Sequence, residues 1–145
     1  MKVSTKGRYA LRMLLDLAEH KSDGFISLKE IAERQNISKQ YLEQIVSLLN
    51  TSNILRANRG KQGGYMLAKE PSACTVAQIL RITEGNLAPV ACLENETNPC
   101  DRAPFCQTLP MWEGLNKAIT DYLDNVTLQD MLDQYREQNA DNYVI

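Results

Sequence analysis

The 145-residue sequence has no long apolar run and no recognisable catalytic motif. No stretch approaches the roughly 18–20 apolar residues that span a bilayer, so we expect no membrane segment. The first ten residues, MKVSTKGRYA, lack the apolar core of a secretory signal, which favours a cytoplasmic protein. No nucleophile–base pair is visible, and the turn from Gly60 to Gly64 lacks the spacing of a phosphate-binding loop. We therefore expect that the protein is not an enzyme.

The charged residues are divided unequally between the two halves of the chain. The net charge is only −2, which as a whole-chain number argues against nucleic acid. Residues 1–70, however, carry 12 Lys and Arg against 7 Asp and Glu, a balance of +5, whereas residues 71–145 carry 4 against 11, a balance of −7. This asymmetry favours a nucleic-acid-binding module joined to an acidic segment, although an uneven surface without a partner gives the same count.

Apolar spacing and capping residues predict three helices and a hairpin in the first 70 residues. Helices are expected at 4–20, 28–36 and 39–52, and about four residues join the last two, as in a helix-turn-helix. Two extended runs, 54–57 and 65–68, flank a basic glycine-rich turn and predict a β-hairpin. The fold class is therefore mostly α, a winged helix-turn-helix, with a further helix at 75–83, a long helix at 108–125 and a short helix from 127.

The start of the helix at 39–52 and the wing suit DNA. The N-terminal half of the second helix of a helix-turn-helix enters the major groove, where Ser, Lys, Gln and Glu find partners on bases or phosphates. An arginine on a narrow glycine-rich tip can enter a minor groove. The candidate DNA-binding residues are Lys6, Arg8, Ser38, Lys39, Gln40, Glu43, Gln44, Arg59 and Lys61, with Lys2 and Arg12 as further phosphate contacts. The alternative is an ordinary solvated face, which the order of turn, helix and wing disfavours.

Three of the four cysteines lie in the aperiodic segment 86–107. Cys92, Cys100 and Cys106 have the spacing C-x7-C-x5-C. In a reducing compartment, such thiols indicate metal or redox chemistry before a disulfide framework. A loop that folds back can bring three thiolates to one centre, and soft thiolates select iron–sulfur clusters, zinc or copper(I). The alternative is three ordinary loop cysteines. We interpret Cys74, which precedes a helix cap at Thr75, as structural.

The long helix at 108–125 carries a stripe of apolar residues at steps of three or four. Such a stripe is usually plain core, but the winged unit buries its own core and leaves little for an isolated long helix to pack on. Pairing with the same helix of a second copy solves this, so we predict a homodimer with two DNA half-sites. The predicted dimerisation residues are Trp112, Leu115, Ile119 and Tyr122.

Four motifs resemble one family over nearly the whole chain. STKGRYA at the start, YLEQIV in the third helix, RGKQGGY in the wing and TLQD in the last helix are similar to the IscR/CymR family, the Rrf-type winged-helix repressors of bacteria. The resemblance implies a dimer on an imperfect palindrome of double-stranded DNA. It also implies that Tyr41, Glu43 and Gln44 lie at the base-reading surface, that Arg59 lies at the minor groove, and that the long helix is the dimerisation helix.

The resemblance further implies an iron–sulfur cluster of the 2Fe–2S or 4Fe–4S type on Cys92, Cys100 and Cys106. The gap between the first two cysteines is two residues longer than is usual in cluster-binding members. The histidine that serves as fourth ligand in the iron–sulfur biogenesis regulator is replaced here by Leu109, and the acid that nitric-oxide-sensing relatives use near position 8 is Arg8. The fourth ligand is therefore left open between Cys74, Glu94, Glu96, Asp101, a partner residue and a small molecule.

The last residues, Asp141-Asn-Tyr-Val-Ile145, resemble the C-terminal peptide of serine acetyltransferase, whose final isoleucine carboxylate enters the active site of cysteine synthase. The CymR branch of the family, which represses cysteine metabolism, ends similarly and partners with that enzyme. We therefore hypothesise that Tyr143, Val144 and Ile145 form a docking tail for cysteine synthase. The alternative is a frayed terminus.

The sequence thus predicts a homodimeric transcriptional repressor that senses iron–sulfur or cysteine status. Three units are expected: a winged helix-turn-helix at 1–70, a connecting helix and cysteine loop at 71–107, and the dimerisation helix, short helix and tail at 108–145. The rival from another class is an iron–sulfur or metal carrier whose helix-turn-helix is only a scaffold. No feature of the sequence identifies the DNA site or the regulated genes.

Overall fold

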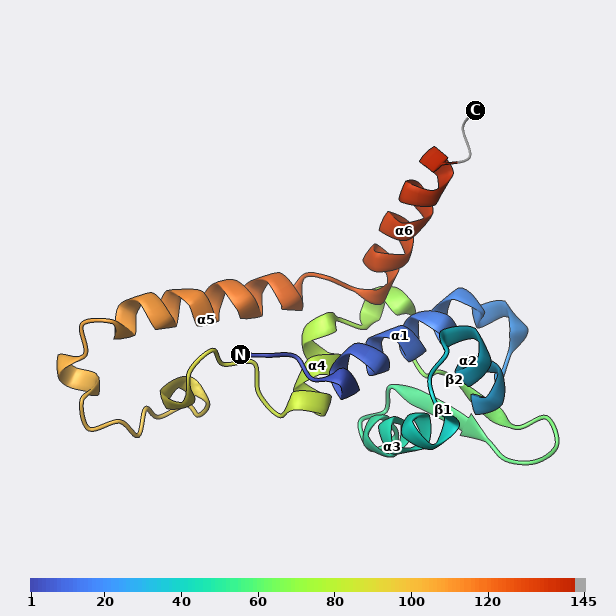
Figure 1. Ribbon diagram of the computed structural model, residues 1–145, viewed down its shortest axis with the longest axis horizontal. Coiled ribbons are helices and arrows are strands. Elements are labelled where there is room, and N and C mark those ends of the chain that lie inside the picture. Colours follow the sequence, from blue (N-terminus) through green and yellow to red (C-terminus); the bar gives the residue numbers. More distant parts are fainter. Residues whose placement is uncertain (143–145) are drawn as a thin grey trace.

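Three helices and a hairpin form the N-terminal half of the computed structural model, which describes residues 1–142, and three further helices follow (Figure 1). The predicted tail residues Tyr143, Val144 and Ile145 lie outside the described residues. No helix within the described part of the chain is both long and apolar enough to cross a membrane. The elements are α1 (Thr5–Glu19), α2 (Leu28–Gln35), α3 (Lys39–Asn50), β1 (Leu55–Asn58), β2 (Gly64–Leu67), α4 (Val76–Glu84), α5 (Leu109–Asp124) and α6 (Leu128–Asn142).

Local capping fixes where the helices begin and end. The hydroxyls of Ser4, Ser27 and Ser38 each accept a hydrogen bond from a backbone N–H in the first turn of α1, α2 and α3. Asn36 ends α2 in the left-handed conformation, with φ of 54°, and so makes the sharp turn toward α3. Thr75 begins α4 with a reciprocal capping box to Gln78. These short-range interactions explain why most helix bounds agree with the sequence prediction, although α6 runs four residues further than expected.

The wing is an antiparallel hairpin held against the helical unit by a third extended segment. β1 and β2 pair in the register Leu55↔Leu67 to Asn58↔Gly64. Tyr65 then exchanges two backbone hydrogen bonds with Ile26, at 2.8 and 2.9 Å, which anchors the base of the wing. Gly64 is required at this anchor because a Cβ there would lie 2.3 Å from the Ile26 carbonyl oxygen.

The hydrophobic core lies between α1, α2, α3 and the base of the hairpin, and it extends into later elements. Ile79 of α4 and Leu128 of α6 belong to the same buried cluster as the winged unit. The fully buried large side chains include Met13, Leu14, Leu17, Ile31, Leu42, Ile45, Leu49, Ile79 and Leu128. The unit is therefore stabilised by residues from both halves of the sequence, and the division at residue 70 stays a prediction.

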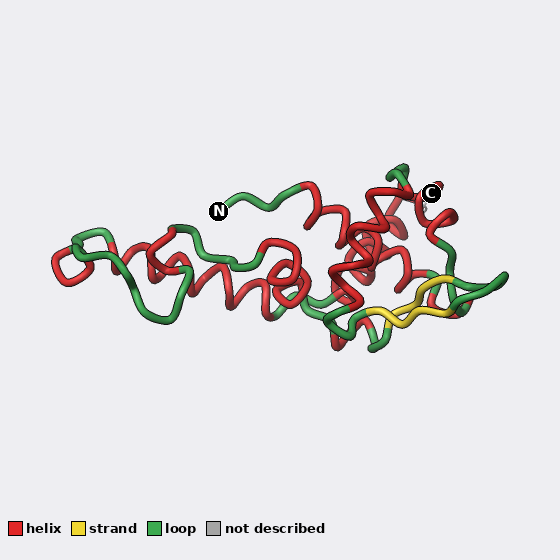
Figure 2. Tube along the Cα trace, turned by 90° about the horizontal axis from the view of Figure 1, so that it is seen from below, coloured by secondary structure: helices red, strands yellow, loops and turns green. Residues whose placement is uncertain are grey.

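A long arm leaves this core and returns to it. Figures 1 and 2 show α5 and the loop before it reaching away from the winged unit, with the wing tip at the opposite end of the molecule. The arm departs and returns at one place, because Thr75 and Thr127 form an antiparallel bridge. Backbone hydrogen bonds from Val76 N to Val126 O and from Leu128 N to Cys74 O, at 2.8 and 2.9 Å, close it.

Asp16 is a buried carboxylate that joins α1 to α2. Its side chain is 1% exposed and accepts two hydrogen bonds from Arg34, at 2.7 and 3.0 Å, and one from Gln35 at 2.9 Å. Burial raises the pKa of this carboxyl, but the hydrogen bonds from Arg34 and Gln35 and the Arg34 charge outweigh it, so the pKa of Asp16 lies below its ordinary value. The ion pair is therefore present at neutral pH.

We predict that Asp16→Asn lowers the free energy of unfolding by about 2 kcal/mol at pH 7, because it removes the charge from the hydrogen bonds to Arg34. Urea unfolding measures this loss, and Asp23→Asn, at an exposed carboxyl, is the matched control. A carboxyl with a lowered folded pKa stabilises the fold above its unfolded pKa of about 4 and loses this effect as the pH falls through the folded value. The difference in free energy of unfolding between the wild type and Asp16→Asn should therefore become smaller as the pH falls. An equal difference at pH 7 and pH 2 would contradict the assignment of Asp16 as a stabilising, ionised carboxylate.

Candidate DNA-binding surface and cysteine loop

The first half of α3 presents polar side chains to solvent over an apolar underside. Leu42, Ile45, Val46 and Leu49 are buried in the core. This burial turns the other face outward because side chains three or four residues apart share one side of a helix. The predicted base-contacting residues Ser38, Lys39, Gln40, Glu43 and Gln44 are all exposed. Ser38 also caps the helix, since its Oγ accepts from Tyr41 N at 3.1 Å.

Tyr41, which the family resemblance assigns to the base-reading surface, has a different environment. Its ring is half-buried and meets the Tyr9 ring edge to face, with centroids 5.4 Å apart. Such aromatic contacts add specific geometry to apolar burial. The structure therefore places Tyr41 at the boundary between the exposed face of α3 and α1, and only part of the residue is free to meet a ligand.

The wing carries its two predicted cations on its turn. Arg59 and Lys61 are both exposed and flank Gly60, whose φ of 117° favours glycine. A hydrogen bond of 3.0 Å from Gly63 N to Gly60 O tightens the turn. α3 packs against β1, so the helix and the wing share one end of the molecule (Figure 1). The arrangement presents a polar helix face beside a basic tip.

The basic residues of α1 are not equivalent. Arg8 is exposed and donates to Thr5 Oγ1 at 3.0 Å, while Lys6 is half-buried. Arg12, expected to contact phosphate, instead donates to Gln35 at the end of α2. The structure thus brings together α3 and the wing, leaves Arg8 available to a phosphate, and engages Arg12 within the protein.

The cysteine loop holds its thiols apart in the described conformation. Cys92 lies at a 3-10 turn, Ala91–Leu93, and Cys106 follows another, Ala103–Phe105. Cys92 and Cys106 are partly exposed and Cys100 is exposed, and none of them forms a disulfide. Among the described residues, no three His, Cys, Asp or Glu side chains are gathered as they would be around a metal ion. The donor chemistry suits a cluster, but three donors do not converge in this conformation.

A neighbouring threonine favours the thiolate form of Cys106. Hydrogen bonding to Thr108, whose Oγ1 lies 3.3 Å from Sγ, lowers the pKa of Cys106, with a smaller contribution from the Arg102 charge. A lowered pKa favours the thiolate, which is the form that binds metal. The surroundings of Cys106 therefore favour the form of the thiol that acts as a ligand.

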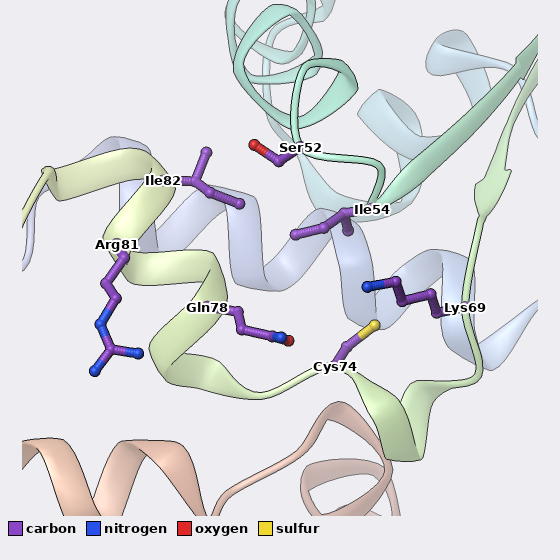
Figure 3. A pocket seen from close by; sticks show the side chains of 7 residues that line it. All are labelled: Ser52, Ile54, Lys69, Cys74, Gln78, Arg81 and Ile82. Carbon is purple, nitrogen blue, oxygen red and sulfur yellow. The ribbon is translucent and has the colours of Figure 1, made fainter.

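Cys74 belongs to the core. It is 1% exposed, and burial raises the pKa of its thiol. Figure 3 shows it beside Lys69 at the edge of a cavity of about 230 Å³ between the end of α3, the start of β1 and α4. A buried neutral thiol does not suit metal binding. This environment agrees with the structural interpretation of Cys74.

The apolar stripe of α5 is divided between two directions. Ile119 packs with Leu123 and Val126 against the buried cluster of α4. Leu115 and Tyr122 are 41% and 69% exposed, as are Met111 and, just before the helix, Phe105, at 53% and 81%. Trp112 is half-buried. The structure thus places Ile119 against its own chain, whereas Leu115 and Tyr122 lie on an uncovered apolar face.

Sequence reasoning missed the polar residues that hold α1 to the helix-turn-helix. Asp16 and Gln35 were not singled out, although Asp16 lies among apolar residues on the buried face of α1. An acidic residue at a core position of an amphipathic helix is the signal that identifies it, because buried charges are paired.

Comparison with known proteins now identifies the family. Residues 3–134 match the family described as Rrf2, iron-dependent transcriptional regulator. The HTH-type transcriptional regulator CymR of Bacillus subtilis is 41% identical over 131 residues, which cover 90% of this chain and 89% of the relative. IscR of Yersinia enterocolitica is 36% identical over 147 aligned residues, which cover 97% and 88%.

Solved structures give the same result. CymR of B. subtilis superposes with a TM-score of 0.74 at 40% identity, covering 90% of this chain and 95% of that one. IscR of T. potens superposes with a TM-score of 0.76 at 40% identity, covering 95% and 90%. These relatives confirm the predicted winged helix-turn-helix fold, and they are regulators of transcription rather than enzymes or carriers. The chain therefore belongs to the Rrf2 family of iron-dependent transcriptional regulators, and it is a DNA-binding regulator.

Proposed function

We propose that this regulator is a homodimeric repressor, which reads an imperfect palindrome with α3 and the wing and responds to iron–sulfur or cysteine status. The observation that carries the DNA-binding part is the exposed polar face of α3 beside the exposed Arg59 and Lys61 of the wing. In this arrangement Glu43 and Gln44 face base edges, Arg59 enters a minor groove, and Lys39 contacts a phosphate. The site of action is the cytoplasm, where bacterial DNA lies.

We predict that Arg59→Ala weakens binding to the recognised duplex by about 1–3 kcal/mol, because it removes the wing contact. The duplex is first recovered by the wild type from a randomised DNA pool, and affinity is then measured by fluorescence anisotropy at several salt concentrations. Arg136→Ala, at an exposed arginine of α6, is the matched control and should bind like the wild type. Equal affinities for the Arg59 variant and the control would exclude the wing from DNA binding.

The dimer is supported by the uncovered apolar face of α5. Met111, Leu115 and Tyr122 are exposed in a helix in which no residue is buried. A second copy of the same helix covers this face with a two-fold axis, which also places two DNA-binding units on two half-sites. Leu115, Tyr122 and Trp112 are the proposed contacts between copies, and Ile119 supports the helix from within its own chain.

Iron–sulfur binding is supported by the chemistry of the three loop cysteines and not by their positions in the structure. Cys92, Cys100 and Cys106 lie on an exposed loop, and Thr108 lowers the pKa of Cys106. The relatives compared above include IscR of Yersinia enterocolitica and IscR of T. potens, and the family is described as iron-dependent. Binding a cluster requires the loop to close, since the three thiols are apart in the described conformation. A fourth ligand is not assigned.

We predict that protein purified without oxygen contains iron and absorbs visible light, and that Cys100→Ala loses both, because the cluster loses one of three thiolate ligands. The measurements are an absorbance spectrum and iron and sulfide assays. Cys74→Ala removes a buried thiol and is the matched control, which should keep the colour. Wild-type protein that is colourless and free of iron would show that this chain is not a cluster protein.

The cysteine branch of the proposal rests on the tail. A solved relative is named the global cysteine regulator of B. subtilis. The C-terminal sequence Tyr143-Val144-Ile145 is proposed to dock in cysteine synthase through the terminal carboxylate. This partner connects the regulator to sulfur supply without requiring a cluster, so the two branches can be tested separately.

Removal of Ile145 should abolish binding to cysteine synthase from the same organism, because the anchoring carboxylate and side chain are both displaced. Isothermal titration of the intact and shortened proteins measures the effect. Glu137→Gln, at an exposed residue of α6, is the control and should bind like the intact protein. The docking hypothesis fails if the shortened protein binds as tightly as the intact one.

A further inference from the structure

Three polar residues of α1 lie on one face of the helix and point at the helix-turn-helix. Tyr9, Arg12 and Asp16 are spaced at i, i+3 and i+7, which places their side chains on one side of a helix. Each of them has a partner in α2 or α3, or contacts a residue that does. We call this set the Tyr9–Arg12–Asp16 face.

Gln35, the last residue of α2, forms hydrogen bonds with two residues of this face, Arg12 and Asp16. Its Nε2 donates to Asp16 Oδ2 at 2.9 Å, and its Oε1 accepts from Arg12 Nε at 3.3 Å. Its backbone oxygen accepts a further hydrogen bond from Arg12 Nη2. The last carbonyls of a helix lack partners within the helix, so this bond satisfies one of them. The residue that opens the turn of the helix-turn-helix is therefore held on both its side chain and its backbone.

The same arginine connects to the first turn of α3. The Arg12 guanidinium lies over the Tyr9 ring, 5.2 Å from its centroid, and the Tyr9 ring meets Tyr41 edge to face at an interplanar angle of 74°. Tyr41 is followed by Glu43 and Gln44, the proposed base-contacting residues. A continuous set of contacts therefore runs from Gln35, before the turn, through Arg12 and Tyr9 to Tyr41, after it.

We propose that the Tyr9–Arg12–Asp16 face positions α3 and thereby determines base selectivity without touching DNA. Only five residues separate Gln35 from Tyr41, and both are fixed to α1, so the angle between α2 and α3 is set from outside the turn. Bidentate contacts to bases tolerate displacements of only a fraction of an ångström, and backbone-phosphate contacts tolerate more. Substitutions that break the contacts of this face should therefore reduce the selectivity for particular bases more than they reduce the affinity for DNA of any sequence.

This inference rests on the proposed role of α3 in reading bases. Arg12 has a competing explanation as a phosphate contact, because it is exposed and lies on the basic half of the chain. The two explanations predict different results for the substitution of Arg12 by lysine. A phosphate contact needs only the positive charge, whereas the Gln35 contacts and the Tyr9 ring require the planar fork of arginine.

The test uses Arg12→Lys, Arg12→Ala, Tyr9→Leu and Tyr9→Phe in the full-length protein. The probe is the duplex that the wild type recovers from a randomised pool, together with a copy in which the selected base pairs are exchanged. We expect Arg12→Lys to reduce the ratio of the two affinities about tenfold, the effect of losing one charge-assisted hydrogen bond. Tyr9→Leu should reduce the same ratio because it removes the ring that contacts Arg12 and Tyr41. Tyr9→Phe keeps the ring and should restore the ratio. Arg136→Lys on α6 is the matched control.

Salt dependence separates the explanations. The slope of log affinity against log salt should be unchanged in Arg12→Lys and in Arg12→Ala if Arg12 acts within the protein. A slope reduced by about 1 in Arg12→Ala, with the selectivity of Arg12→Lys intact, would identify a phosphate contact and overturn the proposal. Variants that melt earlier but keep their selectivity would overturn it too, because they would show a merely structural role. If the wild type recovers no sequence, the proposed function fails instead.

Discussion

The buried carboxylate of Asp16 is the interaction on which the DNA-binding unit depends. Among the side chains that the structure describes, it is the only buried charged one. An isolated buried charge is costly, so the fold must bring Arg34 and Gln35 of α2 to it. Apolar packing alone would allow α2 to slide or rotate on α1. The three hydrogen bonds that Asp16 accepts from α2 fix the position of α2 relative to α1. The direction of α3 follows, because only a short turn separates it from α2.

Much of the fold follows from local rules, and for this reason it was predictable. Ser27, Ser38 and Thr75 each precede an apolar periodic segment and each caps a helix through its own hydroxyl. Asn36 at the end of α2 and Gly60 of the wing likewise take conformations that their residue types favour. In all these cases the information lies within four residues of the feature, so a sequence pattern captures it.

The remainder depends on contacts between distant residues. The partners of Asp16 lie 18 and 19 positions away, and nothing in the spacing indicates that Gln35 joins Asp16 to Arg12. The apolar stripe of α5 could likewise not be assigned from the sequence. Part of the stripe packs on the protein's own core and part of it is exposed, and only the contact of Ile119 with α4 in the structure distinguishes the two parts. The three loop cysteines were predictable as a set, but the conformation of a loop with two 3-10 turns and several prolines was not.

One physical connection between the arm and the DNA-binding unit passes through α4. Glu84, one residue before the loop begins, accepts hydrogen bonds from the Ser4 backbone at 2.9 Å and the Ser4 hydroxyl at 2.7 Å, at the start of α1. One turn earlier in α4, Arg81 pairs with Asp124 at the end of α5, at 3.0 Å. The last turn of α4 thus contacts both the N-cap of α1 and the last turn of α5.

The bridge between Thr75 and Thr127 gives the molecule a modular plan. The chain between these paired positions consists of α4, which packs on the core, and of the loop and α5, which begin and end at fixed points. Insertions and deletions inside the loop leave the register of the flanking segments unchanged. The loop can therefore change in length or in sequence while the DNA-binding unit keeps the same shape.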